Sequence, residues 1–152
     1  MFIKPEQENS VEQDSRFPSG PWKGFFLQPQ IKGRSWMDLE LTFREGTLRG
    51  EGRDWVGAFI IVGRYESESG KCWWTKQYLG KHDVAYQGYN EGKGIWGGWE
   101  IPLENRGGFH IWPVAMGNPD TGKLTEAIEE PELLKVASSL EDALSGNQEY
   151  PT

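Results

Sequence analysis

Residues 72–101 read CWWTKQYLGKHDVAYQGYNEGKGIWGGWEI, and this stretch determines the predicted fold. Side chains alternate between two faces in three short runs, 71–78, 82–88 and 95–101, with glycine-bearing turns between them. A period of two is typical of β-strands that bury one face. The stretch also holds four of the eight tryptophans. It therefore predicts an antiparallel meander that supplies much of an aromatic core.

The same pattern continues on both sides of this meander. Further runs cover 20–28, 35–44, 47–52, 56–65 and 109–114, and short turns join most of them. Eight short runs joined this way predict an all-β fold, a single antiparallel up-and-down barrel of about eight strands. The run 56–65 is apolar on both faces, so we expect a covering layer over Ala58, Ile60 and Val62.

Composition divides the chain into three parts. Residues 1–19 lack glycine and tryptophan and are rich in acidic residues, which predicts a flexible acidic arm. Residues 20–117 form the predicted barrel domain. Residues 118–152 are an acidic C-terminal segment, with an amphipathic helix expected at about 131–145 because apolar residues recur there at helical spacing: Leu133, Val136, Ala137, Leu140 and Leu144. This helix packs either outside the barrel, with Ala58, Ile60 and Val62 as one option, or on a partner protein.

The charge distribution argues against two classes of partner. The barrel region holds 12 basic and 11 acidic residues, and residues 118–152 hold 2 basic and 8 acidic ones. Nucleic acids and anionic membranes are bound through clustered Lys and Arg, so we expect neither as a partner. A single cysteine, no apolar run of membrane-spanning length and no signal-peptide pattern at the N-terminus predict a cytoplasmic protein.

Strand parity predicts a pocket inside the barrel for a small, mostly apolar ligand with an anionic or hydrogen-bonding end. Lys76 shares the inner face of its strand with aromatic residues and would be the one fixed charge there. An anionic ligand could compensate a buried ammonium; alternatively Lys76 lies at the rim, or pairs with Glu100 or Asp83. The candidate ligand-binding residues are Tyr65, Trp74, Lys76, Tyr78, His82, Tyr86 and Trp99.

The outer face offers an alternative function. Trp36, Trp73 and Trp96 have outward parity and could form a contact surface, including one between copies of the chain. In this alternative the chain is a non-enzymatic interaction module with a solid barrel core, working through these tryptophans or the acidic helix.

Catalysis, cofactors and metals have little support in the sequence. His82 and His110 belong to no motif that fixes either beside Cys72 or a serine, so a nucleophile–base pair is not indicated. Metal-ligand spacing is not recognisable, and the glycines of 92–98 are not followed by a helix that could bind phosphate. We therefore expect no catalytic residues, no metal and no cofactor.

The start of the first predicted strand resembles a known superfamily. Gly20-Pro21-Trp22 is similar to the G-x-W signature that opens the barrel of lipocalins and, in a related form, of avidins. The resemblance to these calycins implies that Trp22 plugs the barrel base and that Arg106 packs over it. Calycins bind small molecules, which implies the same for this chain. The disulfide of lipocalins, the helix pair of fatty-acid-binding proteins and the biotin-binding residues of avidins are not recognisable, so the resemblance implies no particular ligand.

Overall fold

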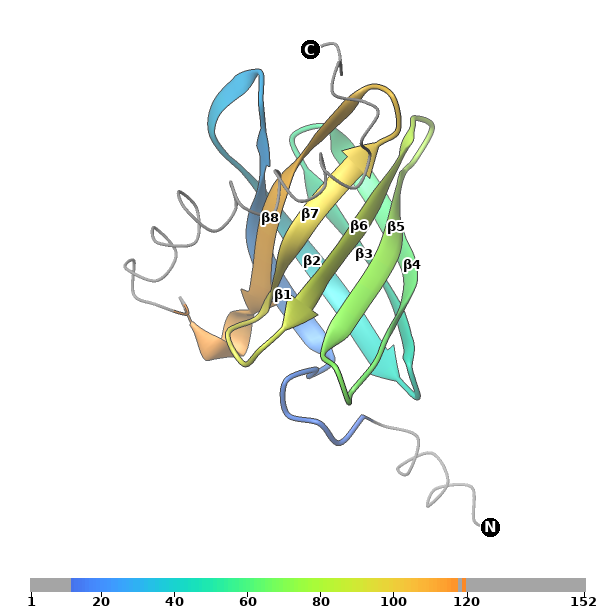
Figure 1. The fold of residues 1–152 in the computed structure, drawn as a ribbon, viewed down its shortest axis with the longest axis vertical. Coiled ribbons are helices and arrows are strands. Elements are labelled where there is room, and N and C mark those ends of the chain that lie inside the picture. Colours follow the sequence, from blue (N-terminus) through green and yellow to red (C-terminus); the bar gives the residue numbers. More distant parts are fainter. Residues whose placement is uncertain (1–11, 118, 120–152) are drawn as a thin grey trace.

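The computed structural model describes residues 12–117 and 119, and these form a closed barrel of eight antiparallel strands (Figure 1). The predicted all-β, up-and-down fold is confirmed. The strands are β1 (Gly20–Gln28), β2 (Ile31–Arg44), β3 (Thr47–Asp54), β4 (Gly57–Tyr65), β5 (Lys71–Tyr78), β6 (Asp83–Asn90), β7 (Ile95–Ile101) and β8 (Asn105–Pro113), followed by the short 3₁₀ helix η1 (Val114–Met116).

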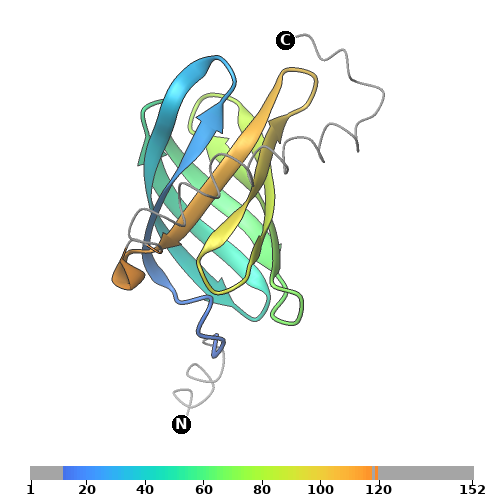
Figure 2. The same ribbon diagram turned by 60° about the vertical axis from the view of Figure 1, so that its left-hand side comes forward.

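Each strand pairs with its neighbours in sequence, and β8 closes the barrel on β1 (Figure 2). Turns therefore alternate between the two ends of the barrel. The upper end in Figure 1 carries the turns at 29–30, 55–56, 79–82 and 102–104. The lower end carries the other turns and the N-terminal approach to β1, and is called the arm end below. A closed sheet leaves no unpaired edge strand.

The alternation in the sequence sets the inner face of the barrel. On β2 the buried positions are Met37, Leu39, Leu41 and Phe43, while the residues between them are exposed. On β5 and β6 the same period of two buries Trp74, Lys76, Tyr78, Val84 and Tyr86. The predicted parity of these strands is confirmed. Apolar burial of this kind is the main source of stability in such a core.

Strand β8 begins earlier than predicted. The predicted run began at residue 109, but residues 106–108, Arg-Gly-Gly, lie within the strand. The reason is close packing: a Cβ at Gly107 would lie 2.1 Å from the carbonyl oxygen of Leu27 and 2.7 Å from Trp99 Nε1. Glycine is used here for close approach, not for a turn.

The described part of the N-terminal arm packs against the arm end. Phe17 is fully buried and contacts the rings of Phe43 and Tyr65 at centroid distances of 5.3 and 4.7 Å. Arg16 Nη1 donates to the carbonyl of Asn90 at 2.9 Å, and Asn90 Nδ2 donates back to the Arg16 carbonyl at 2.7 Å. The flexible arm expected over 1–19 is thus not seen in residues 12–19; residues 1–11 lie outside the described residues.

The expected packing of Arg106 over Trp22 is wrong. Trp22 lies opposite Pro113 on β8, whereas Arg106 lies near the other end of that strand, opposite Glu100. The Trp22 indole instead donates to the carbonyl of Pro18 at 2.8 Å, and its ring contacts Phe43 at 5.4 Å. The arm, not an arginine of the last strand, closes this end of the barrel.

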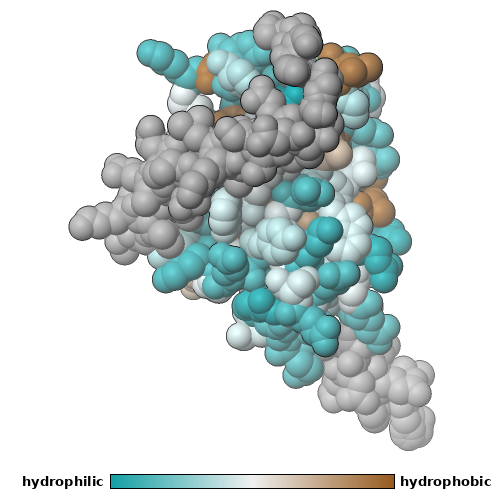
Figure 3. Space-filling view, viewed as in Figure 1, coloured by the Kyte–Doolittle hydropathy of each residue, from teal (hydrophilic) through white to brown (hydrophobic). Residues whose placement is uncertain are grey.

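Among the described residues, none forms the covering layer that was expected over the outward side chains of β4. Ile60 and Val62 remain 37% and 39% exposed, and the predicted helix at 131–145 lies outside the described residues. The face seen in Figure 3 is mostly hydrophilic, with hydrophobic patches at the upper end and along one side. Among the described residues, none of the helices has the length and apolar character needed to span a bilayer.

Candidate functional site: a buried charged cluster in the upper half of the barrel

Lys76 forms an ion pair inside the barrel. Its ammonium lies 2.6 Å from Asp54 Oδ2, and the two side chains are 1% and 0% exposed. Lys76 comes from the inner face of β5, and Asp54 is the last residue of β3. The partners suggested by the sequence, Glu100 and Asp83, are wrong: Asp83 is exposed, and Glu100 lies opposite Arg106 in the β7–β8 pairing.

Asp54 was missed because its strand is longer than predicted. The predicted run ended at residue 52, which left Asp54 in a turn. Leu48, Gly50, Gly52 and Asp54 share one parity, so extending the strand by two residues would have placed Asp54 on the inner face. Its carboxylate accepts from the Tyr78 hydroxyl at 2.6 Å and from the backbone N–H of Val56 at 2.9 Å.

Four aromatic rings surround the ammonium of Lys76. Its Nζ lies 4.5 Å from the ring centroid of Phe26, 4.4 Å from that of Phe59, 4.9 Å from that of Tyr78 and 5.4 Å from that of Tyr86. The negative faces of such rings attract a cation, and the attraction is stronger where water is absent. One carboxylate and a cage of rings therefore hold the charge.

Burial shifts the titration of the cluster. Desolvation lowers the pKa of Lys76 to about 8, and the favourable charge and hydrogen bond of Asp54 oppose this shift. Desolvation, reinforced by the nearby negative charge of Asp54, raises the pKa of Tyr78 and Tyr86 above the usual value for tyrosine. At neutral pH Lys76 thus remains mostly an ammonium, and Tyr78 and Tyr86 remain neutral phenols.

Two donors beside this ion pair lack an acceptor. The buried Trp74 Nε1 has no hydrogen-bond partner among the described residues, and the Trp74 ring stacks on Tyr86 at a centroid distance of 5.3 Å and an angle of 11°. The Tyr86 hydroxyl oxygen accepts from Lys76 at 3.3 Å, and the described residues provide no acceptor for its own proton. An unpaired buried donor costs about 1–3 kcal/mol, so native interiors usually satisfy it.

The structure brings together most of the predicted site residues, with two exceptions. Trp74, Lys76, Tyr78 and Tyr86 form the cluster, and Trp99 lies on the inner face with its indole bonded to the carbonyl of Leu27 at 2.9 Å. Tyr65 faces inward at the arm end, where its hydroxyl contacts Glu12. His82 was expected inside but is exposed, because β6 begins one residue later; its ring packs on Tyr78 at 5.2 Å.

Cys72 is not a reactive thiol in this fold. It is fully buried at the arm end, and burial raises its pKa to about 12, so the thiolate is not populated at neutral pH. His82 follows the opposite end of β5, so strand length separates the two residues. Within residues 12–117 and 119, no group of three or more His, Cys, Asp or Glu side chains is placed to hold a metal ion.

The outer face carries more aromatic residues than the sequence pattern indicated. Trp36, Trp73 and Trp96 face outward as predicted, and Trp36 is 44% exposed. Phe25 and Trp112 also lie on the outer face, yet they are 0% and 5% exposed and form a second small core. On β8, Phe109 and Ile111 face inward, and Trp112 faces outward.

Comparison with known proteins identifies no relative of this chain. No protein-family model, curated protein or solved structure matches this chain. The function is therefore inferred from the geometry of the barrel and its buried cluster.

Proposed function

We propose that the chain is a calycin-like binding protein whose barrel holds a small, mostly apolar ligand by a hydrogen-bond acceptor at the end of that ligand. The observation that supports this most directly is the pair of donors at Trp74 Nε1 and the Tyr86 hydroxyl, which lack an acceptor in the barrel interior. One ligand oxygen at the edges of their two stacked rings, within reach of both groups, would accept both hydrogen bonds. Buried polar groups of this kind are frequent in binding sites.

The charges of the cluster favour a neutral acceptor over an anion. Because Asp54 already neutralises Lys76, no net positive charge remains for a carboxylate ligand. An anion brought beside Asp54 would be repelled and would also lose its own hydration. A neutral carbonyl oxygen needs only the two hydrogen bonds that Trp74 Nε1 and the Tyr86 hydroxyl can donate. The sequence left an anionic and a hydrogen-bonding end as alternatives, and the ion pair supports the second.

The apolar part of the ligand would lie among the inner side chains of the upper half of the barrel. These include Phe26, Met37, Phe59, Val84 and Trp99, all buried. Three pockets lined by described residues open on the outer surface of the barrel, and we expect the ligand to enter the interior by displacing side chains at the upper end. Leu79, which is 58% exposed, and His82 lie in the turn at that end.

Isothermal titration calorimetry with a matched pair of probes tests the proposal. The first probe is 2-undecanone, which has an apolar chain and a neutral carbonyl; the second is undecanoate, which has a similar chain and an anionic end. We expect saturable binding of the ketone with one site per chain and at least about tenfold weaker binding of the carboxylate. A loss of about 1–3 kcal/mol is the usual effect of leaving a buried polar group unpaired.

Two variants of adjacent residues provide the control. Trp74→Phe removes the inner indole donor, and Trp73→Phe makes the same change on the outer face of the same strand. We expect about tenfold weaker ketone binding in the first variant and unchanged binding in the second. A buried water could satisfy the same donors. In that case neither probe would saturate, and the proposal would fail.

A further inference from the structure

The outer surface of β1, β2, β7 and β8 carries an aromatic face that is distinct from the barrel interior. It consists of Phe25, Trp36, Trp96, His110 and Trp112. Phe25 lies 5.4 Å from Trp36 and 6.2 Å from Trp112 between ring centroids, and Trp36 lies 6.2 Å from Trp112. Phe25 and Trp112 are almost fully buried although they point away from the barrel axis.

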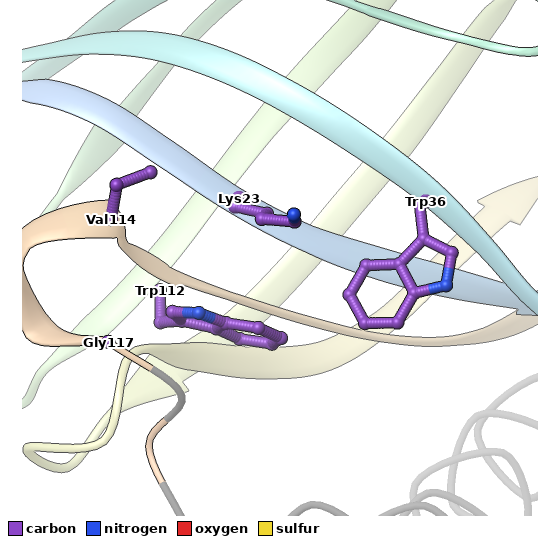
Figure 4. A pocket seen from close by; sticks show the side chains of 5 residues that line it. All are labelled: Lys23, Trp36, Trp112, Val114 and Gly117. Atoms are coloured by element: carbon purple, nitrogen blue, oxygen red, sulfur yellow. The ribbon is translucent and has the colours of Figure 1, made fainter. Parts of the chain in front are cut away.

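A pocket of about 460 Å³ opens on this face (Figure 4). Trp36 and Trp112 line it from two sides, Lys23 lies on β1 between them, and Val114 and Gly117 complete the lining. The face also carries positive charge. Lys23 Nζ lies 5.7 Å from the Trp36 ring centroid, and the Arg34 guanidinium carbon lies 4.7 Å from the Phe25 ring centroid.

The described barrel ends at this pocket. Gly117, which follows η1, lines the pocket and directly precedes the remaining 35 residues of the chain, 118–152. These residues include the amphipathic pattern at 131–145 and hold 8 acidic against 2 basic residues. The 13 residues between Gly117 and Pro131 can span up to about 43 Å when extended, which is ample for a return to the barrel surface.

We infer that residues 131–145 of the same chain dock on the aromatic face as an amphipathic helix. Its apolar stripe, Leu133, Val136, Ala137, Leu140 and Leu144, would cover Phe25, Trp36 and Trp112, and its acidic residues would lie near Lys23 and Arg34. The apolar contact supplies the driving force, and the charges set the orientation. The inference does not depend on ligand binding inside the barrel.

The aromatic face suits this helix better than the β4 surface that the sequence suggested. On β4, Ile60 and Val62 are more than a third exposed and carry no ring, whereas the aromatic face has a pocket lined by Trp112 and by Trp36, which is 44% exposed. In the closed order of eight strands, β4 and β8 lie on opposite sides of the barrel. The two docking sites therefore predict different neighbours for the segment, and one experiment distinguishes them.

Paramagnetic broadening in the full-length chain makes this distinction. A nitroxide is attached to Ser138→Cys, on the side of the predicted helix away from its apolar stripe; Cys72, buried and with a raised pKa, does not react. We expect the indole N–H signals of Trp36 and Trp112 to lose most of their intensity, while the methyl signals of Ile60 and Val62 keep most of theirs. The reverse pattern, or no broadening, would overturn the inference.

Further samples distinguish docking within one chain from docking between two copies. In the labelled chain, Leu140→Asp should restore the Trp36 and Trp112 signals because it places a charge in the stripe, whereas Glu141→Gln, on the flank, should leave the broadening in place. A mixture of ¹⁵N protein that carries no nitroxide with ¹⁴N protein that carries one should show no broadening. Broadening in the mixture would show that the segment binds a second copy, which contradicts docking on its own barrel.

Discussion

The ammonium of Lys76 is held inside the barrel by one carboxylate and four rings. Burying two charges costs several kcal/mol per ion, and their attraction repays this cost only when the remaining hydrogen-bonding groups are satisfied. Here Asp54 accepts from Lys76, Tyr78 and the Val56 amide. The charges and hydrogen bonds of the Lys76–Asp54 pair are therefore satisfied. Removing one partner is expected to lower the free energy of unfolding far more than removing both.

Asp54→Asn should destabilise the fold by about 3–5 kcal/mol, because Lys76 would be left buried without its counter-charge. The asparagine oxygen can still accept from the Val56 amide, so the turn itself is preserved. Urea unfolding followed by tryptophan fluorescence measures the change. The double variant Asp54→Asn with Lys76→Met should recover most of the loss, and Asp83→Asn, at an exposed site, should change stability by less than about 0.5 kcal/mol. An equal loss in the single and double variants would contradict the coupling.

The lowered pKa of Lys76 predicts a rise of stability with pH. Its pKa is about 8 in the folded barrel and 10.5 in the unfolded chain. Between these values the unfolded chain binds more protons than the native one, so raising the pH favours the native state. The contribution is roughly 2 kcal/mol between about pH 8 and about pH 9.5. The raised pKa values of Cys72, Tyr78 and Tyr86 give a slope of opposite sign in both proteins, so the Lys76 contribution is read as a difference. In urea unfolding at several pH values, stability should change with a more positive slope in the wild type than in Lys76→Met; the same slope in both proteins would refute the prediction.

The sequence allowed the inner face to be predicted residue by residue wherever alternation was strict. Trp74, Lys76, Tyr78 and Tyr86 were placed together for that reason. Asp54 could not be placed because two glycines, at 50 and 52, weaken the pattern of its strand, although they are needed where the strand packs closely on Glu40 and Asp38. His82 was misplaced because β6 begins only at Asp83, so His82 lies in the preceding turn although its parity matches that of Val84 and Tyr86.

At the scale of elements, the N-terminal arm is the feature that the sequence described least well. Its polar composition predicted a loose attachment, yet Phe17 fills the arm end and Arg16 bonds to Asn90 across the barrel. A single apolar ring in a polar segment carries no periodicity, so its burial could not be derived from the pattern alone. The strand bounds were predictable where glycine-bearing turns follow alternating runs, as at both ends of β5.

Phe17→Ala should lower the free energy of unfolding by about 3–5 kcal/mol, because it removes a fully buried ring and leaves a cavity beside Phe43 and Tyr65. Chemical unfolding checks this. Leu103→Ala removes a side chain that is 79% exposed, and it should have little effect. Comparable losses in the two variants would mean that the arm does not stabilise the barrel.

At the scale of the whole molecule, the closure between β1 and β8 determines whether the sheet has edges. Gly24 lies at this closure: a Cβ there would meet the carbonyl oxygen of His110 at 2.1 Å and Ile111 Cα at 2.5 Å. Both contacts are with backbone, so the strands themselves must move to accommodate a side chain. The barrel is thus closed by a glycine that the period-two pattern alone could not distinguish from the other strand glycines.

Gly24→Ala should open the barrel at this point before the rest of the sheet unfolds. Hydrogen exchange measured by mass spectrometry should show at least about tenfold faster exchange in peptides from β1 and β8, with smaller changes in β3 to β6. Lys23→Ala, at the adjacent outward position, should leave exchange near the wild-type rate. Uniform acceleration over all strands in Gly24→Ala would contradict the expectation of local opening.

The indole N–H signal of Trp74 in a ¹H–¹⁵N spectrum tests the binding hypothesis most directly. With 2-undecanone added to saturation, this signal should move downfield, as expected for a newly formed hydrogen bond, while the signals of Trp36 and Trp73 on the outer face stay in place. Trp74→Phe assigns the signal by its disappearance. If the ketone moves only signals of outer-face tryptophans, the ligand does not bind inside the barrel, and the proposed function is wrong.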